Sequence, residues 1–280
     1  GYAEPTLNLK SSEFNDFDVM LCDKIIAYDH LKQKITVIVN MKTNDLENQY
    51  NKAINDIDEI VKMINDPTTV SKLTSYKDVE FKSNFTEEEY ADTVNKTKEY
   101  IFDGDIFQAV ISRRFETKYE GSLLNAYRVL RVTNPSPYMV FMKIGENEII
   151  STSPETLVRY QNGRMTTFPI AGSRPRGKTE EEDIALEKDL LQDEKELSEH
   201  NMLVDLGRND IGKISKFNSV TVTEYMKVLR YSKIMHICSE VQSDALDTVD
   251  SFDAIEAVLP AGTLSGAPKV RACEIIEELE

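Results

Sequence analysis

The sequence predicts an α+β fold, and two observations carry the prediction. Short runs of β-branched and apolar residues, bounded by turn residues, recur along the chain and are typical of strands. Between them lie longer segments whose apolar residues repeat every three or four positions, as in amphipathic helices. Strands that follow one another through short turns, mixed with helices, indicate the α+β class.

The first part of the chain is expected to form a small region of its own. Strands are predicted at residues 17–22 and 34–39, and a helix at residues 46–64. Residues 66–83 are polar and irregular, so they are predicted to be a linker. The predicted domains are therefore residues 1–83 and residues 84–280.

The second domain begins with a helix whose start has a clear signal. Thr86 and Glu89 have the spacing of a capping box, and the helix is expected to reach Phe102. The other elements are expected in this order: a strand at 106–115, a helix at 122–133, strands at 138–144, 148–151, 156–161 and 164–169, a helical region at 179–206, strands at 219–225 and 231–241, and helices at 252–259 and 270–280.

Composition and charge exclude several functions. The 280 residues carry a formal net charge of −16, which disfavours binding to nucleic acid or to an anionic membrane. No apolar run approaches the roughly 20 residues that span a bilayer, and no signal peptide is visible. The cysteines, Cys22, Cys238 and Cys273, match no zinc pattern and suit a reducing cytoplasm. Cys238 and Cys273 are expected to be small core residues.

Two glycine-containing stretches could bind an anionic ligand. Phe168 to Gly177 combines Ala-Gly-Ser with two arginines, and Pro260 to Lys269 combines exposed backbone, hydroxyls and a lysine. Glycine lets backbone amides approach a ligand, and arginine matches a carboxylate or phosphate. The alternative for the first stretch is a basic turn between a strand and an acidic helix.

These stretches, with Asp193 to Asp210 between them, closely resemble the chorismate-utilising enzyme family, and most closely its anthranilate-forming members. The resemblance runs from about Phe85 to Glu280 and more faintly back to Gly1. It implies two antiparallel β-sheets packed as a sandwich with helices outside. It also implies that residues 84–280 are the chorismate-binding catalytic domain with its C-terminal part missing, so we expect a fragment lacking both ends.

An acidic pair on the predicted helix is the candidate metal site. Glu196 and Glu199 are three residues apart and share a helical face, where two carboxylates could hold Mg²⁺. The alternative is a solvated acidic face. The resemblance assigns the metal glutamate to Glu199 and makes Glu196 either a residue that supports the metal ligands without touching the metal or an alternate ligand. It places a further metal glutamate outside this chain. His200 is expected to be a packed, hydrogen-bonded histidine.

Three residues are candidates for catalysis. The resemblance makes Glu155 the general acid that protonates the leaving hydroxyl, which requires a carboxyl kept partly protonated by burial. Gln108 stands where water-adding members carry a lysine base, and an amide cannot accept a proton at neutral pH. This favours ammonia as the nucleophile. Asp253 stands where many anthranilate-forming members have a histidine linked to pyruvate elimination; aspartate is commoner in the aminodeoxychorismate branch.

The resemblance also places the substrate. Gly172 and Ser173, with Gly262 and Thr263, match positions that contact chorismate. Ala171 replaces the lysine nucleophile of many aminodeoxychorismate synthases, which argues against that activity. A larger group has roles left open. Arg174, Arg176 and Lys269 could bind the substrate's charge or form local salt bridges, and Pro137, Tyr138 and Met139 resemble the strand that lines a tryptophan inhibitor pocket.

The expected function is therefore a cytoplasmic, Mg²⁺-dependent lyase step of tryptophan biosynthesis. Chorismate and ammonia would give anthranilate and pyruvate, with ammonia supplied by a separate glutamine amidotransferase subunit. The alternatives are an aminodeoxychorismate synthase of the folate pathway and a ligand-binding remnant without turnover. The 280 residues alone are expected to be inactive, because part of the family's site is missing.

Overall fold

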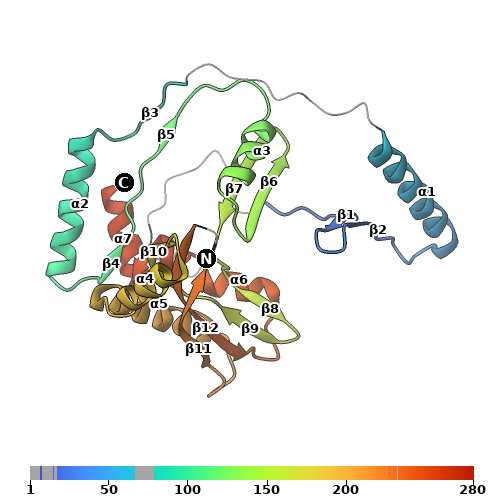
Figure 1. Ribbon diagram of the computed structural model, residues 1–280. Coiled ribbons are helices and arrows are strands. Elements are labelled where there is room, and N and C mark those ends of the chain that lie inside the picture. The colour runs from blue at the N-terminus through green and yellow to red at the C-terminus, as the bar shows by residue number, and fades with distance from the viewer. Residues whose placement is uncertain (1–6, 8–14, 16–17, 67–78, 232) are drawn as a thin grey trace. The chain divides into compact units, whose positions relative to one another are not determined.

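The computed structural model describes residues 7, 15, 18–66, 79–231 and 233–280. Contacts divide the chain into two units, one formed by Lys10–Tyr76 and the other by Gly1–Leu9 with Lys77–Glu280. Helices and antiparallel strands are mixed throughout, so the α+β class is confirmed (Figure 1). The domain boundary at residue 83 stays a prediction. Within the described residues, no helix is long and apolar enough to cross a membrane.

The smaller unit contains a hairpin and one helix. β1 (Lys24–Asp29) pairs antiparallel with β2 (Lys34–Val39), and α1 (Leu46–Asn65) packs against β2. The predicted strand at 34–39 and the predicted helix are confirmed.

The strand expected at residues 17–22 is wrong. Residues 18–22 have no strand structure, and Phe17 lies outside the described residues. The side chain of Asp29 accepts hydrogen bonds from the backbone amides of Leu31 and Lys32, at 3.0 and 2.9 Å, and so forms the turn. Because a turn sets the register of its hairpin, the residues immediately before Asp29 pair with β2.

A five-stranded antiparallel sheet forms the centre of the larger unit. Its order is β10-β12-β9-β8, and β11 pairs with the other edge of β12. The strands are β8 (Arg159–Gln161), β9 (Arg164–Thr167), β10 (Ile170–Pro175), β11 (Thr221–Arg230) and β12 (Ile234–Asp244). The stretch Phe168 to Gly177 is therefore mostly a strand, and its reading as a basic turn is wrong. Pairing with β12, far along the chain, makes it a strand.

Two helices replace the single helical region predicted at residues 179–206. α4 (Glu180–Leu190) contacts β10, and α5 (Glu194–Gly212) packs on β9, β10 and β12. The break lies at Asp193, whose side chain accepts from the amides of Lys195 and Glu196 and caps α5. α6 (Ser251–Val258) packs against α5. The core of this region consists of the buried residues Met165, Val204, Ile211, Val241, Ala245, Ala254 and Val258.

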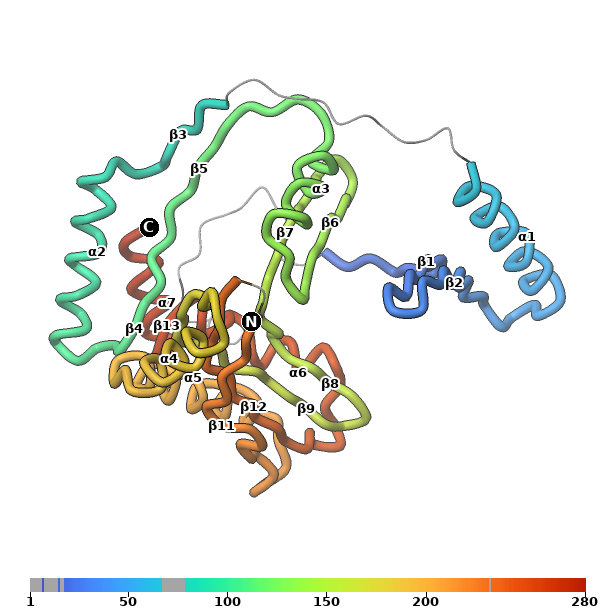
Figure 2. Tube along the Cα trace, in the orientation of Figure 1, coloured from blue at the N-terminus to red at the C-terminus, as the bar shows by residue number. Residues whose placement is uncertain are grey.

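The remaining strands form short pairs. The bounds are β3 (Lys82–Ser83), β4 (Gln108–Ala109), β5 (Phe115–Glu116), β6 (Tyr138–Ile144), β7 (Asn147–Ser153) and β13 (Gly266–Ala267). β3 pairs with β5, β6 with β7, and β4 with β13, which lies close to it in Figure 2. Within the described residues these pairs stay separate, so the second sheet of the expected sandwich is not assembled as one sheet.

Three more of the predicted helices of the second domain are confirmed, whereas one predicted strand is not. The helices are α2 (Glu87–Phe102), α3 (Leu124–Thr133) and α7 (Lys269–Leu279), and the capping box of α2 is present. The single strand predicted at 106–115 is wrong, since only its two ends form strands. The first end, β4, pairs with β13, and the second end, β5, pairs with β3. Because no single strand runs alongside both ends, the ladder is interrupted between them.

Ion pairs join the end of β10 to α4. The guanidinium of Arg176 contacts Asp183, and the amide of Gly177 donates to the same carboxylate at 2.6 Å. These contacts, the arginine first, lower the pKa of Asp183 from 3.8 to about 2. The stabilisation is therefore fully present above pH 3.8 and is lost as the pH falls through about 2.

Asp183→Asn is accordingly expected to lower the urea midpoint at neutral pH. The deficit relative to the wild type should shrink as the pH falls from about 4 to about 2, because the wild-type carboxylate becomes neutral there. Asp247→Asn is the control, since its pair with Lys216 is exposed and should contribute little. A deficit that persists unchanged at the acidic end would assign the effect to shape rather than charge.

Candidate active site

α5 separates a buried core from an open pocket. Its buried residues, which recur at helical spacing on the side facing the sheet, are His200, Leu203, Val204, Gly207, Asp210 and Ile211. The residues of the same helix that line the pocket are Lys195, Ser198, Glu199, Met202, Asp205, Leu206, Arg208, Asn209 and Gly212, and Lys213 follows directly after the helix. One helix therefore supplies both the support and most of one wall.

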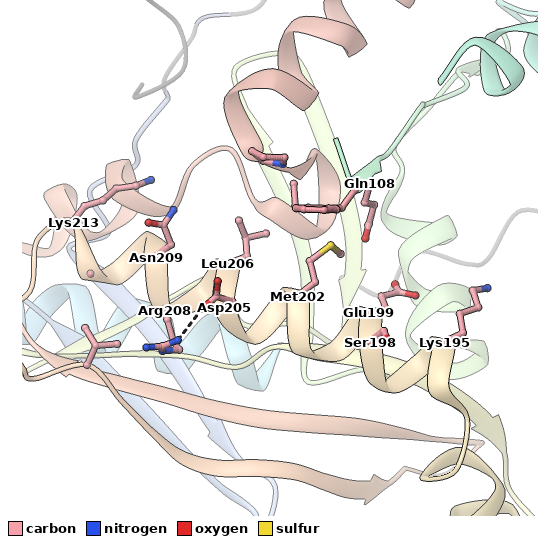
Figure 3. A pocket seen from close by; sticks show the side chains of 15 residues that line it. Gln108, Lys195, Ser198, Glu199, Met202, Asp205, Leu206, Arg208, Asn209 and Lys213 are labelled. Atoms are coloured by element: carbon pink, nitrogen blue, oxygen red, sulfur yellow. Dashed lines mark hydrogen bonds and ion pairs between the residues drawn. The ribbon is translucent and has the colours of Figure 1, made fainter. Parts of the chain in front are cut away.

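We call this space the α5 pocket; it has a volume of about 1220 Å³ and Phe107, Gln108, Ala267 and Pro268 on its other side. Figure 3 shows Glu199 and Met202 on the side of α5 that faces Gln108. The structure thus brings together two predicted site residues, Gln108 and Glu199, from segments far apart in the sequence.

Glu196 and Glu199 do not point to the same place. Glu199 lines the α5 pocket, whereas Glu196 does not. A carboxylate oxygen of Glu196 lies 3.2 Å from the position that a Cβ on Gly172 would occupy, so Glu196 faces β10. Three residues advance a helix by about 300°, and the resulting offset of about 60° is enough to separate the two side chains when the sheet covers one of them.

The fit of the α5 pocket to Mg²⁺ rests on Glu199. Mg²⁺ is usually held by one or two carboxylates together with substrate oxygens and waters, so one carboxylate in a roomy pocket is compatible with it. No group of three histidine, cysteine or acidic side chains suited to a metal occurs among the described residues. Glu199 would therefore be the ligand from this part of the chain, with Ser198 the neighbouring hydroxyl.

A second, smaller cavity contains Glu155. This Glu155 cavity has a volume of about 160 Å³ and is also lined by Gly262, Thr263 and Asp210, while Leu206 borders both spaces. Glu155 follows β7 and is half-buried. Burial raises the pKa of its carboxyl above the ordinary 4.5, and a hydrogen bond with the Thr263 side chain offsets part of the rise. The group is thus biased towards the protonated form that a general acid needs.

Residues 259–268, here called the α6–α7 loop, contribute to both spaces. Gly262 and Thr263, in the 3₁₀ turn η3 (Gly262–Leu264), line the Glu155 cavity, and Ala267 and Pro268 line the α5 pocket. Phe107 donates its amide to Ala267 at 2.7 Å and Val110 donates to Ser265 at 2.8 Å, so this loop also holds Gln108 in place.

Gly266 is required by both conformation and space. Its φ is +153°, and an added Cβ would fall well inside van der Waals distance of the Gln108 carbonyl oxygen and 2.8 Å from Ala272 Cβ. Neither neighbour is the flexible end of a side chain. The pairing of β4 with β13 therefore depends on glycine at this position.

Gly266→Ala is expected to lower the free energy of unfolding by at least about 2 kcal/mol, because strain and overpacking add. Gly145→Ala is the matched control: its φ is +59° and nothing lies within 4 Å of an added Cβ, so only the backbone cost of about 1 kcal/mol applies. Urea denaturation of both variants checks the difference. Equal costs would show that the β4–β13 contact is not close-packed.

The predicted substrate residues of β10 line neither space. Ala171 is buried, and Gly172, at φ +70°, lies in a bulge between Ala171 and Ser173. The hydroxyl of Ser173 lies 2.9 Å from Nδ1 of His236, and the Gly172 carbonyl lies 3.2 Å from the same nitrogen. His236 was not identified from the sequence, because its partners come from a strand paired through tertiary contacts.

The three basic residues with open roles all form ion pairs with aspartates in this structure. Arg174 contacts Asp189 and Asp193 at 2.6 and 2.9 Å, and Arg176 contacts Asp183, so both form local salt bridges. A further cation, Lys269, is buried against acidic and carbonyl oxygens.

Asp253 lies at the start of α6, and its carboxylate accepts from the backbone amide of Asp250 at 2.8 Å. It lines neither the α5 pocket nor the Glu155 cavity. The structure therefore shows Asp253 in a capping contact, and the catalytic role of Asp253 stays a prediction.

The predicted inhibitor residues lie on the hairpin formed by β6 and β7. Tyr138 pairs with Ser153, Met139 with Thr152, and the Tyr138 hydroxyl lies 2.6 Å from Thr156 Oγ1. Pro137 directly precedes β6. Tyr138 and Glu155 therefore lie at the same end of one hairpin, and tryptophan binding there stays a prediction.

The expectation for His200 is confirmed. Its side chain is fully buried, Nε2 lies 2.6 Å from Ser239 Oγ, and burial lowers its pKa from 6.5 to about 4. Cys238 is buried as expected, with its pKa raised to about 11 by burial, and Cys273 is half-buried. His200 and Cys238 are therefore buried and uncharged at neutral pH.

The fold and these two spaces define a member of a known enzyme class. The family model for chorismate binding enzymes matches residues 2–280. The chain therefore belongs to the chorismate binding enzyme family, as the sequence resemblance implied.

Curated relatives narrow the comparison. Anthranilate synthase component 1 of Acetivibrio thermocellus is 51% identical over 269 residues, which cover 93% of this chain and 54% of that protein. The protein of the same name from Aquifex aeolicus is 47% identical over 285 residues, covering 100% and 58%. The crystal structure of anthranilate synthase component I from Streptococcus pneumoniae matches with a TM-score of 0.80 at 40% identity, covering 92% and 57%. The chain spans somewhat more than half the length of these relatives.

Proposed function

We propose that this chain carries part of the active site of an anthranilate-forming synthase, in which chorismate and ammonia give anthranilate and pyruvate. The observation that carries the proposal is the half-buried Glu155, which lines a small cavity together with Gly262 and Thr263 and whose pKa is raised by burial. A protonated carboxyl in a small cavity is suited to donating a proton to a leaving hydroxyl. The relatives named anthranilate synthase support the choice of product.

Gln108 supports the choice of nucleophile. It lies on the wall of the α5 pocket and presents an amide, which cannot deprotonate water at neutral pH. Ammonia is already nucleophilic and needs no base. In this reading Gln108 orients the attacking nucleophile or the substrate and takes no proton.

Mg²⁺ is proposed as the cofactor, with Glu199 as its ligand from this span. The metal would supply positive charge to an anionic substrate in a chain whose net charge is −16. We also propose that a separate amidotransferase subunit supplies the ammonia from glutamine and that tryptophan inhibits the enzyme. The proposed location is the cytoplasm.

The alternative product, aminodeoxychorismate, is favoured by Asp253 and disfavoured by Ala171. The buried methyl of Ala171 cannot act as the covalent nucleophile that a lysine would provide. The product assay below distinguishes the two, since only anthranilate formation releases pyruvate with an aromatic amine.

The test uses a protein that extends these residues to the length of their relatives. With chorismate, Mg²⁺ and ammonium at alkaline pH, we expect anthranilate fluorescence with stoichiometric pyruvate, and no isochorismate or salicylate when ammonium is omitted. Residues 1–280 alone serve as the comparison and are expected to be inactive. Isochorismate or salicylate formed at a rate comparable to that of anthranilate would contradict the role assigned to Gln108. Sustained turnover by the 280 residues would contradict the expectation that they hold only part of the active site.

A further inference from the structure

A buried cluster of charges lies behind the α6–α7 loop. The ammonium of Lys269 donates to both carboxylate oxygens of Asp210 at 2.8 Å and to the carbonyl of Val258 at 2.9 Å. The side chains of Lys269 and Asp210 are only 6% and 9% exposed. Burying two charges is costly, and an apolar pair of similar volume is often at least as stable, so stability alone does not account for this arrangement.

The contacts of Lys269 join three elements. Lys269 is the first residue of α7, Val258 is the last residue of α6, and Asp210 lies on α5. One ammonium therefore ties both ends of the α6–α7 loop together and attaches them to α5. The Val258 carbonyl has no partner within α6 because it lies at the helix C-terminus, where a cation is also favoured by the helix dipole.

A second lysine has similar contacts. Lys213 donates to Asp210 at 3.3 Å and to the Ala257 carbonyl at 3.3 Å. The two cations thus cap successive carbonyls at the end of α6, and Asp210 lies between them. Asp210 also lines the Glu155 cavity, so the cluster lies directly beside the proposed catalytic acid.

The α6–α7 loop has little regular structure of its own. Besides the short pairing of β13, its internal backbone bonds are those of one 3₁₀ turn, from Leu264 to Ala261 at 3.1 Å and from Ser265 to Gly262 at 3.2 Å. Thr263 lies in that turn and lines the same cavity as Glu155. Where Thr263 lies therefore depends on how the two loop ends are held.

We propose that Lys269, through Asp210 and Val258, is a positioning residue that holds the α6–α7 loop so that Thr263 stays beside Glu155 in the Glu155 cavity. It touches no reacting atom and acts through the loop. Its catalytic consequence rests on the proposed function, whereas its effect on the loop and on Glu155 does not. The effect can therefore be measured on the 280-residue chain itself.

The test compares Lys269→Met with the double variant Asp210→Leu/Lys269→Met. The double variant replaces the buried pair by apolar groups and is expected to fold even if the single variant does not. Both lose the bond to Val258. Ile275→Val is the control, because it loosens the packing of α7 among buried apolar residues and leaves the charge cluster intact.

Two readouts report on the loop. Amide hydrogen exchange at Leu264 and Ser265 should become about tenfold faster in both Lys269 variants and stay unchanged in Ile275→Val. The pKa of Glu155, measured by carbon-13 NMR titration, should rise, as it should in Thr263→Val, because the hydrogen bond that lowers it is weakened. A folded double variant with wild-type exchange and wild-type Glu155 pKa would overturn the proposal.

The same variants separate this inference from the function. In the extended protein, Lys269→Met should lower kcat with little change in KM and move the alkaline limb of the pH profile upward, in step with the Glu155 pKa. If the wild type forms no anthranilate while the loop and the pKa respond as described, the proposed function fails and the positioning role stands. If anthranilate forms and neither the loop nor the Glu155 pKa responds, the proposed function stands and the positioning role of Lys269 fails.

Discussion

Replacing Glu155 with glutamine is expected to lower kcat for anthranilate formation by about 10²–10⁴-fold in the extended protein. Glutamine keeps the size and the hydrogen bond with Thr263 but has no proton to release at neutral pH. Chorismate affinity, measured by isothermal titration calorimetry, should change much less, because the shape of the Glu155 cavity is retained.

The pH profile adds an independent check on Glu155. A general acid works in its protonated form, so wild-type activity, compared at a constant concentration of free NH3, should fall as the pH rises through the pKa of Glu155. This limb should disappear from the residual activity of Glu155→Gln. The control is Asp247→Asn, which removes an exposed carboxylate paired with Lys216 and should leave the limb in place. Weak chorismate binding with normal turnover at saturation would reassign Glu155 to substrate positioning.

Glu199→Gln is expected to weaken Mg²⁺ binding by at least about tenfold, because an amide replaces the only carboxylate that we assign to the metal in the α5 pocket. Activity at limiting Mg²⁺ should fall in parallel and recover in part at high Mg²⁺. Metal binding is best followed with Mn²⁺ as a paramagnetic substitute, which does not depend on turnover.

Glu196→Gln is the matched control, since it makes the same change three residues away. Its side chain faces Gly172 rather than the α5 pocket, so we expect a smaller effect on metal affinity. Equal losses in the two variants would contradict the separation of their side chains and restore the paired site that the sequence predicts. No loss in either would remove the metal from α5.

Much of the local structure was predictable because its signals lie within a few residues. The capping box of Thr86 and Glu89 begins α2, and regular apolar spacing indicates α1, α3 and α7. The strand at residues 34–39 is equally local. Errors occurred where a distant partner decides: Phe168 to Gly177 becomes a strand by pairing with β12, and the strand predicted at 106–115 is divided between two partners.

The candidate site divides in the same way. The sequence by itself determined which chemical groups are available, a carboxyl at Glu155, an amide at Gln108 and a carboxylate at Glu199, and the family to which they belong.

Only the tertiary structure decided the surroundings of these groups. It buried Glu155 beside Thr263 and turned Glu196 away from Glu199. It also paired Lys269 with the buried Asp210, so that the ammonium does not face an open pocket. The physical reason is that protonation, orientation and ion pairing depend on what lies within a few ångströms. Those neighbours are brought together by the packing of α5 against the sheet and the α6–α7 loop, from segments far apart along the chain.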